Sequence, residues 1–133
     1  MPLSYAIDAR RRVVVTRASG VLTVDDAVRV RVLLQSDPVF RSHFALLFDL
    51  REVTHVNMSF QALARLAATT VFAARARRAF VCATDLQFEI AHAFSLVSRE
   101  HQLVVRVFHE PHTAEAWLAE RRTPESQLAC NVI

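Results

Sequence analysis

The sequence predicts an α/β fold: a mixed, mainly parallel sheet with helices packed on it, in the order β-β-α-β-α-β-α-β-α. Three observations lead to this prediction. Short apolar runs of strand length, of which Ala45–Leu50 is the clearest, alternate with segments of helical periodicity. The helical segments begin at residues that cap helices well, such as Thr23 and Ser59. The 133 residues are enough for one domain around a single core.

The first half of the chain predicts a hairpin followed by a helix. Residues 12–19 are rich in β-branched side chains, and the short Arg10-Arg11 link joins them to a weakly alternating segment, which favours two antiparallel strands. The helix is expected to run to about Ser36 and to be stopped by Asp37-Pro38, because the residue before a proline avoids helical geometry. Arg31 falls within the apolar arc of this helix, where its stem can pack while its head reaches solvent or a carboxylate. The expected strands are 4–9, 12–19, 45–49, 78–83 and 104–108, and the expected helices are 23–36, 59–70, 85–101 and 113–121.

The central strand is the feature that points to a site. Its apolar run ends at Asp49, and a polar loop, Arg51–Ser59, is expected to lead into the next helix. Ligands of α/β folds usually bind at the carboxyl ends of the strands. The predicted partner- or ligand-binding residues are therefore Asp49, Arg51, Thr54, Val56, Asn57, Met58, Ser59 and Phe60.

In the second half of the chain, Thr84 and Thr113 are the expected caps of the last two helices. The central strands should supply the core, and Trp117 should cover one end of it. The residues expected to be buried are Leu47, Phe48, Phe80, Val81, Val105 and Val107. Residues 1–122 form the predicted domain, and residues 123–133, with Cys130, form a predicted flexible tail.

Composition excludes several classes of function. The single glycine, Gly20, excludes the glycine-rich loops that bind dinucleotides or nucleotide phosphates. All 16 basic residues are arginines, so chemistry that needs a lysine amine is absent, and their scatter along the chain argues against nucleic-acid binding. The two cysteines are far apart, and neither a signal peptide nor a membrane span is visible, so a reduced, cytoplasmic protein is expected.

The element order, Asp49-Leu50 and the run Val53–Ser59 together resemble the STAS domains of sulphate transporters and anti-sigma factor antagonists. In that family a central strand ends in Asp-Leu, and Val-Thr-x-Ile-Asp-Ser-Ser-Gly follows before a helix. The resemblance covers roughly residues 1–120, and the spacing is similar to that of a SpoIIAA-like bacterial group of poorly known function. The matching pieces are Leu22–Asp26, Asp37–Phe40, Asp49–Thr54, Arg77–Val81 and Glu115–Leu118.

The resemblance implies a STAS-like fold and a regulatory role through protein contacts. In the regulatory members, the serine at the position of Ser59 is phosphorylated by a partner kinase. Here Asn57 replaces the acid of the motif, Met58 replaces a serine and Phe60 replaces the glycine. Because Phe60 would obstruct the close approach that glycine allows, Ser59 is expected to act mainly as a helix cap.

Neither a metal site nor catalysis is predicted. His109 and His112 form one pair of possible zinc ligands, whereas zinc needs three or four converging ligands. Carboxylates such as Asp49 and Asp85 have adequate roles in loops and caps, and the glycines of a nucleophile elbow are missing around Ser59. No cofactor is expected, and the chain is predicted to be non-enzymatic.

Two binding functions remain open. The leading one is a regulatory module that contacts a protein partner, or a second copy of the chain, through Arg51–Ser59 and the helix that follows. The alternative is a carrier or sensor of a small apolar or lipid-like ligand, held in a groove near Phe72, Phe88 and Phe94. A flat face with exposed apolar residues around Val56, Met58 and Phe60 would favour the first, and a closed apolar pocket near Phe72, Phe88 and Phe94 would favour the second.

Overall fold

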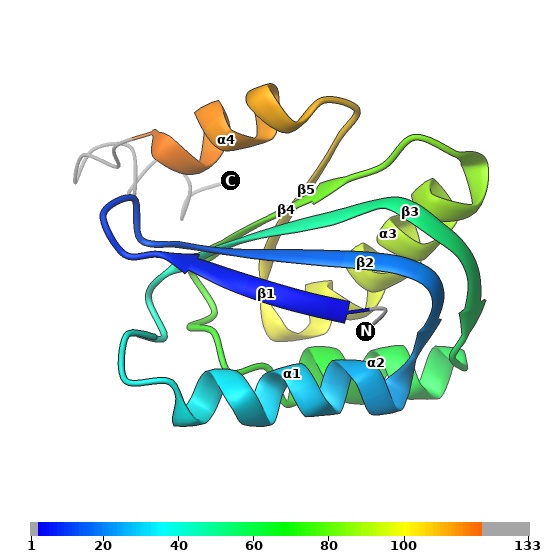
Figure 1. The fold of residues 1–133 in the computed structure, drawn as a ribbon. Coiled ribbons are helices and arrows are strands. Elements are labelled where there is room, and N and C mark those ends of the chain that lie inside the picture. The colour runs from blue at the N-terminus through cyan, green and yellow to red at the C-terminus, as the bar shows by residue number, and fades with distance from the viewer. Residues whose placement is uncertain (1–2, 121–133) are drawn as a thin grey trace.

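One five-stranded sheet organises the molecule, which is described for residues 3–120 in a computed structural model (Figure 1). The strands are β1 (Leu3–Asp8), β2 (Val13–Thr23), β3 (Ala45–Asn57), β4 (Arg77–Val81) and β5 (Val104–Phe108), and they lie in the sheet in that order. The helices are α1 (Val24–Ser36), α2 (Phe60–Ala68), α3 (Asp85–Ser98) and α4 (Pro111–Ala119), with a 3-10 turn η1 (Arg99–His101) after α3. β1 is antiparallel to β2, and the other three pairs are parallel. The predicted fold class and element order are confirmed. The tail predicted at 123–133 lies outside the described residues.

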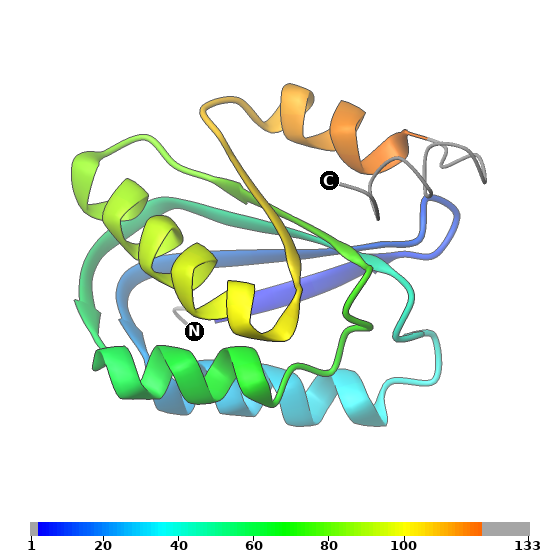
Figure 2. The same ribbon diagram turned by 180° about the vertical axis from the view of Figure 1, so that it is seen from behind.

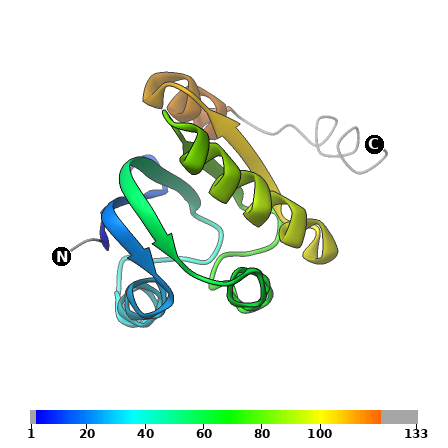
Figure 3. The same cartoon turned by 90° about the vertical axis from the view of Figure 1, so that its right-hand side faces the viewer.

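The helices form two layers on opposite faces of the sheet. Each parallel crossover moves one strand along in the same direction, so a common right-handed sense places α1, α2 and α3 on one face. In Figure 1, α4 lies above the sheet and α1 and α2 lie below it. Figure 2 turns the molecule around and shows α3 in front of the sheet. Figure 3 views α1 and α2 end-on. The larger apolar cluster lies under α1–α3, and a smaller one lies between the sheet and α4.

The prediction of a polar loop over Arg51–Ser59 is wrong, because β3 continues to Asn57. β2 is also longer than predicted, and the two strands pair as far as Thr23 and Asn57. The register slips twice: residue 17 faces residue 49 and residue 19 faces 52, then 20 faces 53 and 21 faces 55. Each slip places an extra residue in β3, which is a bulge. The buried or half-buried positions therefore recur every third residue, at Leu50, Val53 and Val56, which hides the two-residue alternation of a strand.

Gly20 lies at the second irregularity, within β2, where the sequence had suggested the end of the strand. Its φ of +65° is in the left-handed region that glycine adopts at little cost. The backbone can therefore bend without leaving the sheet, and β2 runs on to Thr23, which caps α1 by accepting a hydrogen bond from the amide of Asp26.

The predicted core is correct for the central strands and wrong at the edge. Leu47, Phe80 and Val81 are buried, as expected. Val105 and Val107 are only half-buried, because β5 is an edge strand with one neighbour. Phe48 is also only half-buried, because it borders the cavity described below. Trp117 is half-buried and packs against the smaller cluster.

The start of α4 also differs from the prediction. The helix begins at Pro111, with Glu110 in the cap position, and its side chain makes no capping hydrogen bond. Thr113 is therefore not the cap. Its hydroxyl lies within the first turn and donates to the carbonyl of Glu110 at 2.8 Å.

The buried side chain of Gln87, at the start of α3, holds the extended part of β3. β4 pairs with β3 only as far as Asp49, so the carbonyls beyond that point lack a strand partner on this side. The amide nitrogen of Gln87 donates to the carbonyls of Arg51 and Val53 at 3.0 and 2.9 Å. Its amide oxygen accepts from the backbone amides of residues 83 and 84. The Gln87 side chain thus supplies the hydrogen bonds that a neighbouring strand would otherwise give to these two carbonyls.

Candidate functional site

The predicted site residues do not converge, because most of them are spread along the length of β3. Asp49 lies in the middle of the strand, opposite Arg17 of β2. The guanidinium of Arg51 donates to the Asp49 carboxylate from Nε and a terminal nitrogen, at 3.0 and 2.8 Å, and the Arg51 amide adds a third bond at 3.0 Å. The side-chain bond from Arg51 lowers the pKa of Asp49 against the opposing effect of burial. The carboxylate is therefore ionised, and both of its oxygens accept hydrogen bonds from Arg51.

The end of β3 divides the remaining predicted residues between the surface and the interior. Thr54 and Asn57 are exposed. Val56 and Met58 are half-buried and pack against the larger apolar cluster. Of the three apolar residues expected to form a flat contact face, Val56, Met58 and Phe60, only Phe60 is therefore exposed.

Ser59 and Phe60 lie just beyond the carboxyl end of β3, at the start of α2. Ser59 has extended backbone geometry, and its hydroxyl accepts from the amide of Ala62 at 3.1 Å, which is the bond of a helix cap. Phe60 follows as the first residue of α2, with 57% of its surface exposed. An aromatic ring so exposed at the start of a helix is available for contact.

A cavity of about 120 Å³ lies between the sheet and the helices α1, α2 and α3. Phe72 and Phe94 line it, together with Phe48 and Phe80. Phe88 does not; its ring packs against that of His109, with the centroids 4.8 Å apart. The other apolar lining residues are Leu3, Leu22, Ala27, Val30, Leu34, Leu46, Leu50, Met58, Leu63, Leu66, Val71 and Ile90.

The aromatic wall of the cavity is well packed. Phe80 meets Phe48 edge-on with centroids 5.6 Å apart, and it meets Phe94 at 5.3 Å. Phe72 is fixed from outside by Phe40, edge-on at 5.2 Å. Such contacts hold the rings in defined positions. The space between them is therefore a shaped cavity bounded by rigid groups.

Four polar side chains also line the cavity: Thr16, Thr70, Arg31 and Arg78. Arg78, on β4, is 1% exposed. Its terminal nitrogens donate to the carbonyls of residues 72, 73, 74 and 76 and to the hydroxyl of Thr70, at 2.7–3.3 Å. Burial lowers its pKa to about 10, with the nearby charge of Arg31 as the second cause. It remains a cation at neutral pH.

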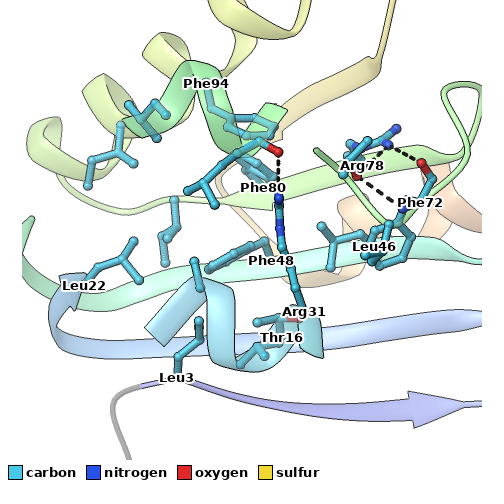
Figure 4. A pocket seen from close by; sticks show the side chains of 18 of the residues that line it. Leu3, Thr16, Leu22, Arg31, Leu46, Phe48, Phe72, Arg78, Phe80 and Phe94 are labelled. Carbon is cyan, nitrogen blue, oxygen red and sulfur yellow. Dashed lines mark hydrogen bonds between the residues drawn. The ribbon is translucent and has the colours of Figure 1, made fainter. Parts of the chain in front are cut away.

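Arg31 enters from the helix layer. Figure 4 shows it reaching across the pocket from α1. It donates to the carbonyls of Leu66 and Thr69 and to the Thr69 hydroxyl, so it covers the last carbonyls of α2. Burial lowers its pKa as well. The sequence had placed its head in solvent or on a carboxylate, and instead it contacts neutral oxygens.

Sequence reasoning missed Arg78 as a pocket residue. The signal was present, because Arg78 and Phe80 are two residues apart in a strand and must share a face. No functional role was predicted for this arginine at the start of its strand. Its burial depends on the segment after α2, whose carbonyls surround it.

Groups suited to metal binding do not assemble within residues 3–120. No three histidine, cysteine, aspartate or glutamate side chains come together there as metal ligands would. The Cys82 thiol is buried, and its pKa is raised to about 11, first by burial and then by the charge of Asp49. It is therefore protonated at neutral pH and a poor nucleophile.

Comparison with known proteins supports the fold. No family model matches the chain, and no curated protein matches it. Among solved structures, it is similar to an uncharacterized protein of the DUF3478 family from Shewanella loihica PV-4, described as having a SpoIIAA-like fold. The two share 19% identity with a TM-score of 0.62, over 87% of this chain and 93% of the other. The chain thus has a SpoIIAA-like fold, as the STAS resemblance implied. In the described part of the chain, no helix combines the length and the apolar character needed to cross a bilayer.

Proposed function

We propose that this protein is a non-catalytic binding module that holds a small, mainly apolar molecule between its sheet and the helices α1–α3. The observation that carries the proposal is the cavity of about 120 Å³, lined by four phenylalanines and a dozen other apolar side chains. An engineered cavity of about 150 Å³ with a similar lining binds benzene, so this one suits a molecule of that size.

A binding role also agrees with the groups that are present. Asp49 is tied to Arg51, Cys82 is buried as a neutral thiol, and Ser59 caps a helix. The side chains that face the cavity bind and orient a molecule, and none of them offers a nucleophile or a general base. A carrier or a sensor needs nothing more.

Titration with benzene, followed by amide and methyl NMR, tests the proposal. We expect saturable shifts confined to residues that line the cavity. Ala27→Phe, which fills the cavity from α1, should abolish them, whereas Ala116→Phe, on the exposed side of α4, should leave them unchanged. Shifts that persist in the filled variant, or no saturable shifts at all, would refute the proposal.

A second candidate function is contact with a protein partner at the start of α2. The exposed ring of Phe60, beside the exposed Asn57 and Ser59, favours it. Phe60→Ser should then weaken capture of a specific partner from the native host, and Val39→Ser, at an exposed apolar residue outside α2, should not. Equal capture by the two variants would contradict this candidate.

A further inference from the structure

We infer that the molecule held in the cavity is a small apolar acid, whose single carboxylate is bound by Arg31 and Arg78. This inference rests on the proposed binding function and names its ligand class. It starts from the presence of two charged side chains in a mainly apolar cavity lining. Sixteen of the lining residues are apolar, and yet two of the remaining four are arginines.

Neither arginine has a counter-charge among residues 3–120. The four ion pairs found there involve Arg11, Arg29, Arg51 and Arg77. Arg31, which is half-buried, and Arg78, which is 1% exposed, donate from their terminal nitrogens only to backbone carbonyls and threonine hydroxyls. These oxygens occupy most of the terminal N–H groups and supply no negative charge. Removing a cation from water without an anionic partner is costly, so buried charges are usually paired.

Local structural roles do not account for two cations at this place. Arg31 covers the carbonyls at the end of α2, and Arg78 binds the carbonyls of the segment that follows. Each role explains the position of one arginine, and neither explains why two like charges line the same cavity. The two charges are close enough to repel, since Arg31 is the second cause that lowers the pKa of Arg78. An anion in the cavity would supply the missing counter-charge and offset the repulsion between the two arginines.

Size and lining then define the rest of the ligand. A cavity of about 120 Å³ leaves room for a body near the size of benzene. The four phenylalanine rings suit a flat ring or a compact branched chain. A carboxylate is planar and accepts two parallel hydrogen bonds from a guanidinium, whereas a phosphate would use more of the small volume. The class is therefore an aromatic or branched-chain monocarboxylate.

Calorimetric titration with two probes of similar size, benzoate and benzyl alcohol, tests the inference. We expect wild-type protein to bind benzoate about tenfold more tightly or better, because its carboxylate gains charge-assisted bonds that the alcohol cannot make. Arg31→Met should abolish this preference while benzyl alcohol still binds. Arg65→Met, which removes an exposed charge from α2 outside the cavity, should keep it. Acetate, which has the carboxylate without the aromatic ring, should bind far more weakly than benzoate.

Each outcome separates the two proposals. Binding of benzyl alcohol equal to or tighter than that of benzoate, or a preference that survives Arg31→Met, would overturn the acid inference and leave the binding function intact. Failure of both probes would overturn both. Arg31→Met is the primary variant, because Arg78→Met also removes bonds that hold residues 72–76. Thermal unfolding of each variant shows that it is folded.

Discussion

At the residue scale, the Asp49–Arg51 pair is the clearest electrostatic feature of β3. A carboxylate whose pKa is lowered in the folded state stabilises the protein above the pKa that it has when unfolded. That stability is lost as the pH falls through the folded pKa. The two residues are close in sequence, and the extended strand aligns their side chains.

Asp49→Asn should therefore flatten the loss of stability on acidification below about pH 4, the ordinary range of an aspartate. Urea unfolding between pH 2 and pH 7 measures the effect. Arg51→Met should flatten the same part of the profile, since the side-chain bond from Arg51 is the main cause of the shift. Profiles parallel to that of the wild type would contradict the prediction.

Ser59 gives a second prediction at this scale. Ser59→Ala should lower the free energy of unfolding by about 1 kcal/mol, because the amide of Ala62 loses its acceptor at the start of α2. Ser59→Asp should retain most of the stability, since an acid caps the helix and suits its dipole. If the two variants were equally destabilised, the hydroxyl would be acting through something other than the cap.

At the scale of elements, the long β3 depends on Gln87. Gln87→Ala should cost about 2–3 kcal/mol, because it leaves two carbonyls and two amides without a partner, some of them buried. Gln87→Glu should cost at least as much, since a carboxylate cannot donate to the carbonyls of Arg51 and Val53. Gln61→Ala, on the exposed side of α2, is the control and should change stability by less than about 0.5 kcal/mol. A similar small change for Gln87→Ala would mean that water replaces its amide.

This same element shows where sequence reasoning succeeds and fails. The cap at Ser59 and the apolar run of the central strand are local signals, and the structure bears them out. The continuation to Asn57 is not local. It depends on two bulges against β2 and on hydrogen bonds from Gln87, which lies 34 residues from Val53 in the chain. No periodicity within residues 51–57 could reveal partners so distant.

At the scale of the whole molecule, the smaller apolar cluster couples α4 to the sheet. Leu47→Ala should destabilise the protein by about 2–5 kcal/mol, because its side chain is buried beneath α4 at the centre of the sheet. Leu33→Ala, at an exposed position on α1, should cost less than about 0.5 kcal/mol. A loss below about 1 kcal/mol for Leu47→Ala would mean that α4 packs loosely there.

The cavity is the whole-molecule feature that the sequence could suggest only in part. Phe72 and Phe94 were assigned to one groove with Phe88, and only the first two line the cavity. Helical and strand periodicity predict which side of an element is apolar. They do not predict whether side chains from strands β1–β4, helices α1–α3 and the segments between them fill the space where they meet. Arg31 and Arg78, from elements far apart in the chain, meet there for the same reason.

The order of strands in the sheet, which follows the order of the chain, has a consequence for how the molecule folds. Each strand pairs with its successor, so no later strand has to be inserted between two that are already paired. The β1–β2 hairpin can form first, and every following helix and strand can add to a single growing edge. Pairing each strand with the next one in the chain closes shorter loops than any other order of these strands would, which favours faster folding than such an order. The sheet can therefore assemble progressively from its N-terminal edge.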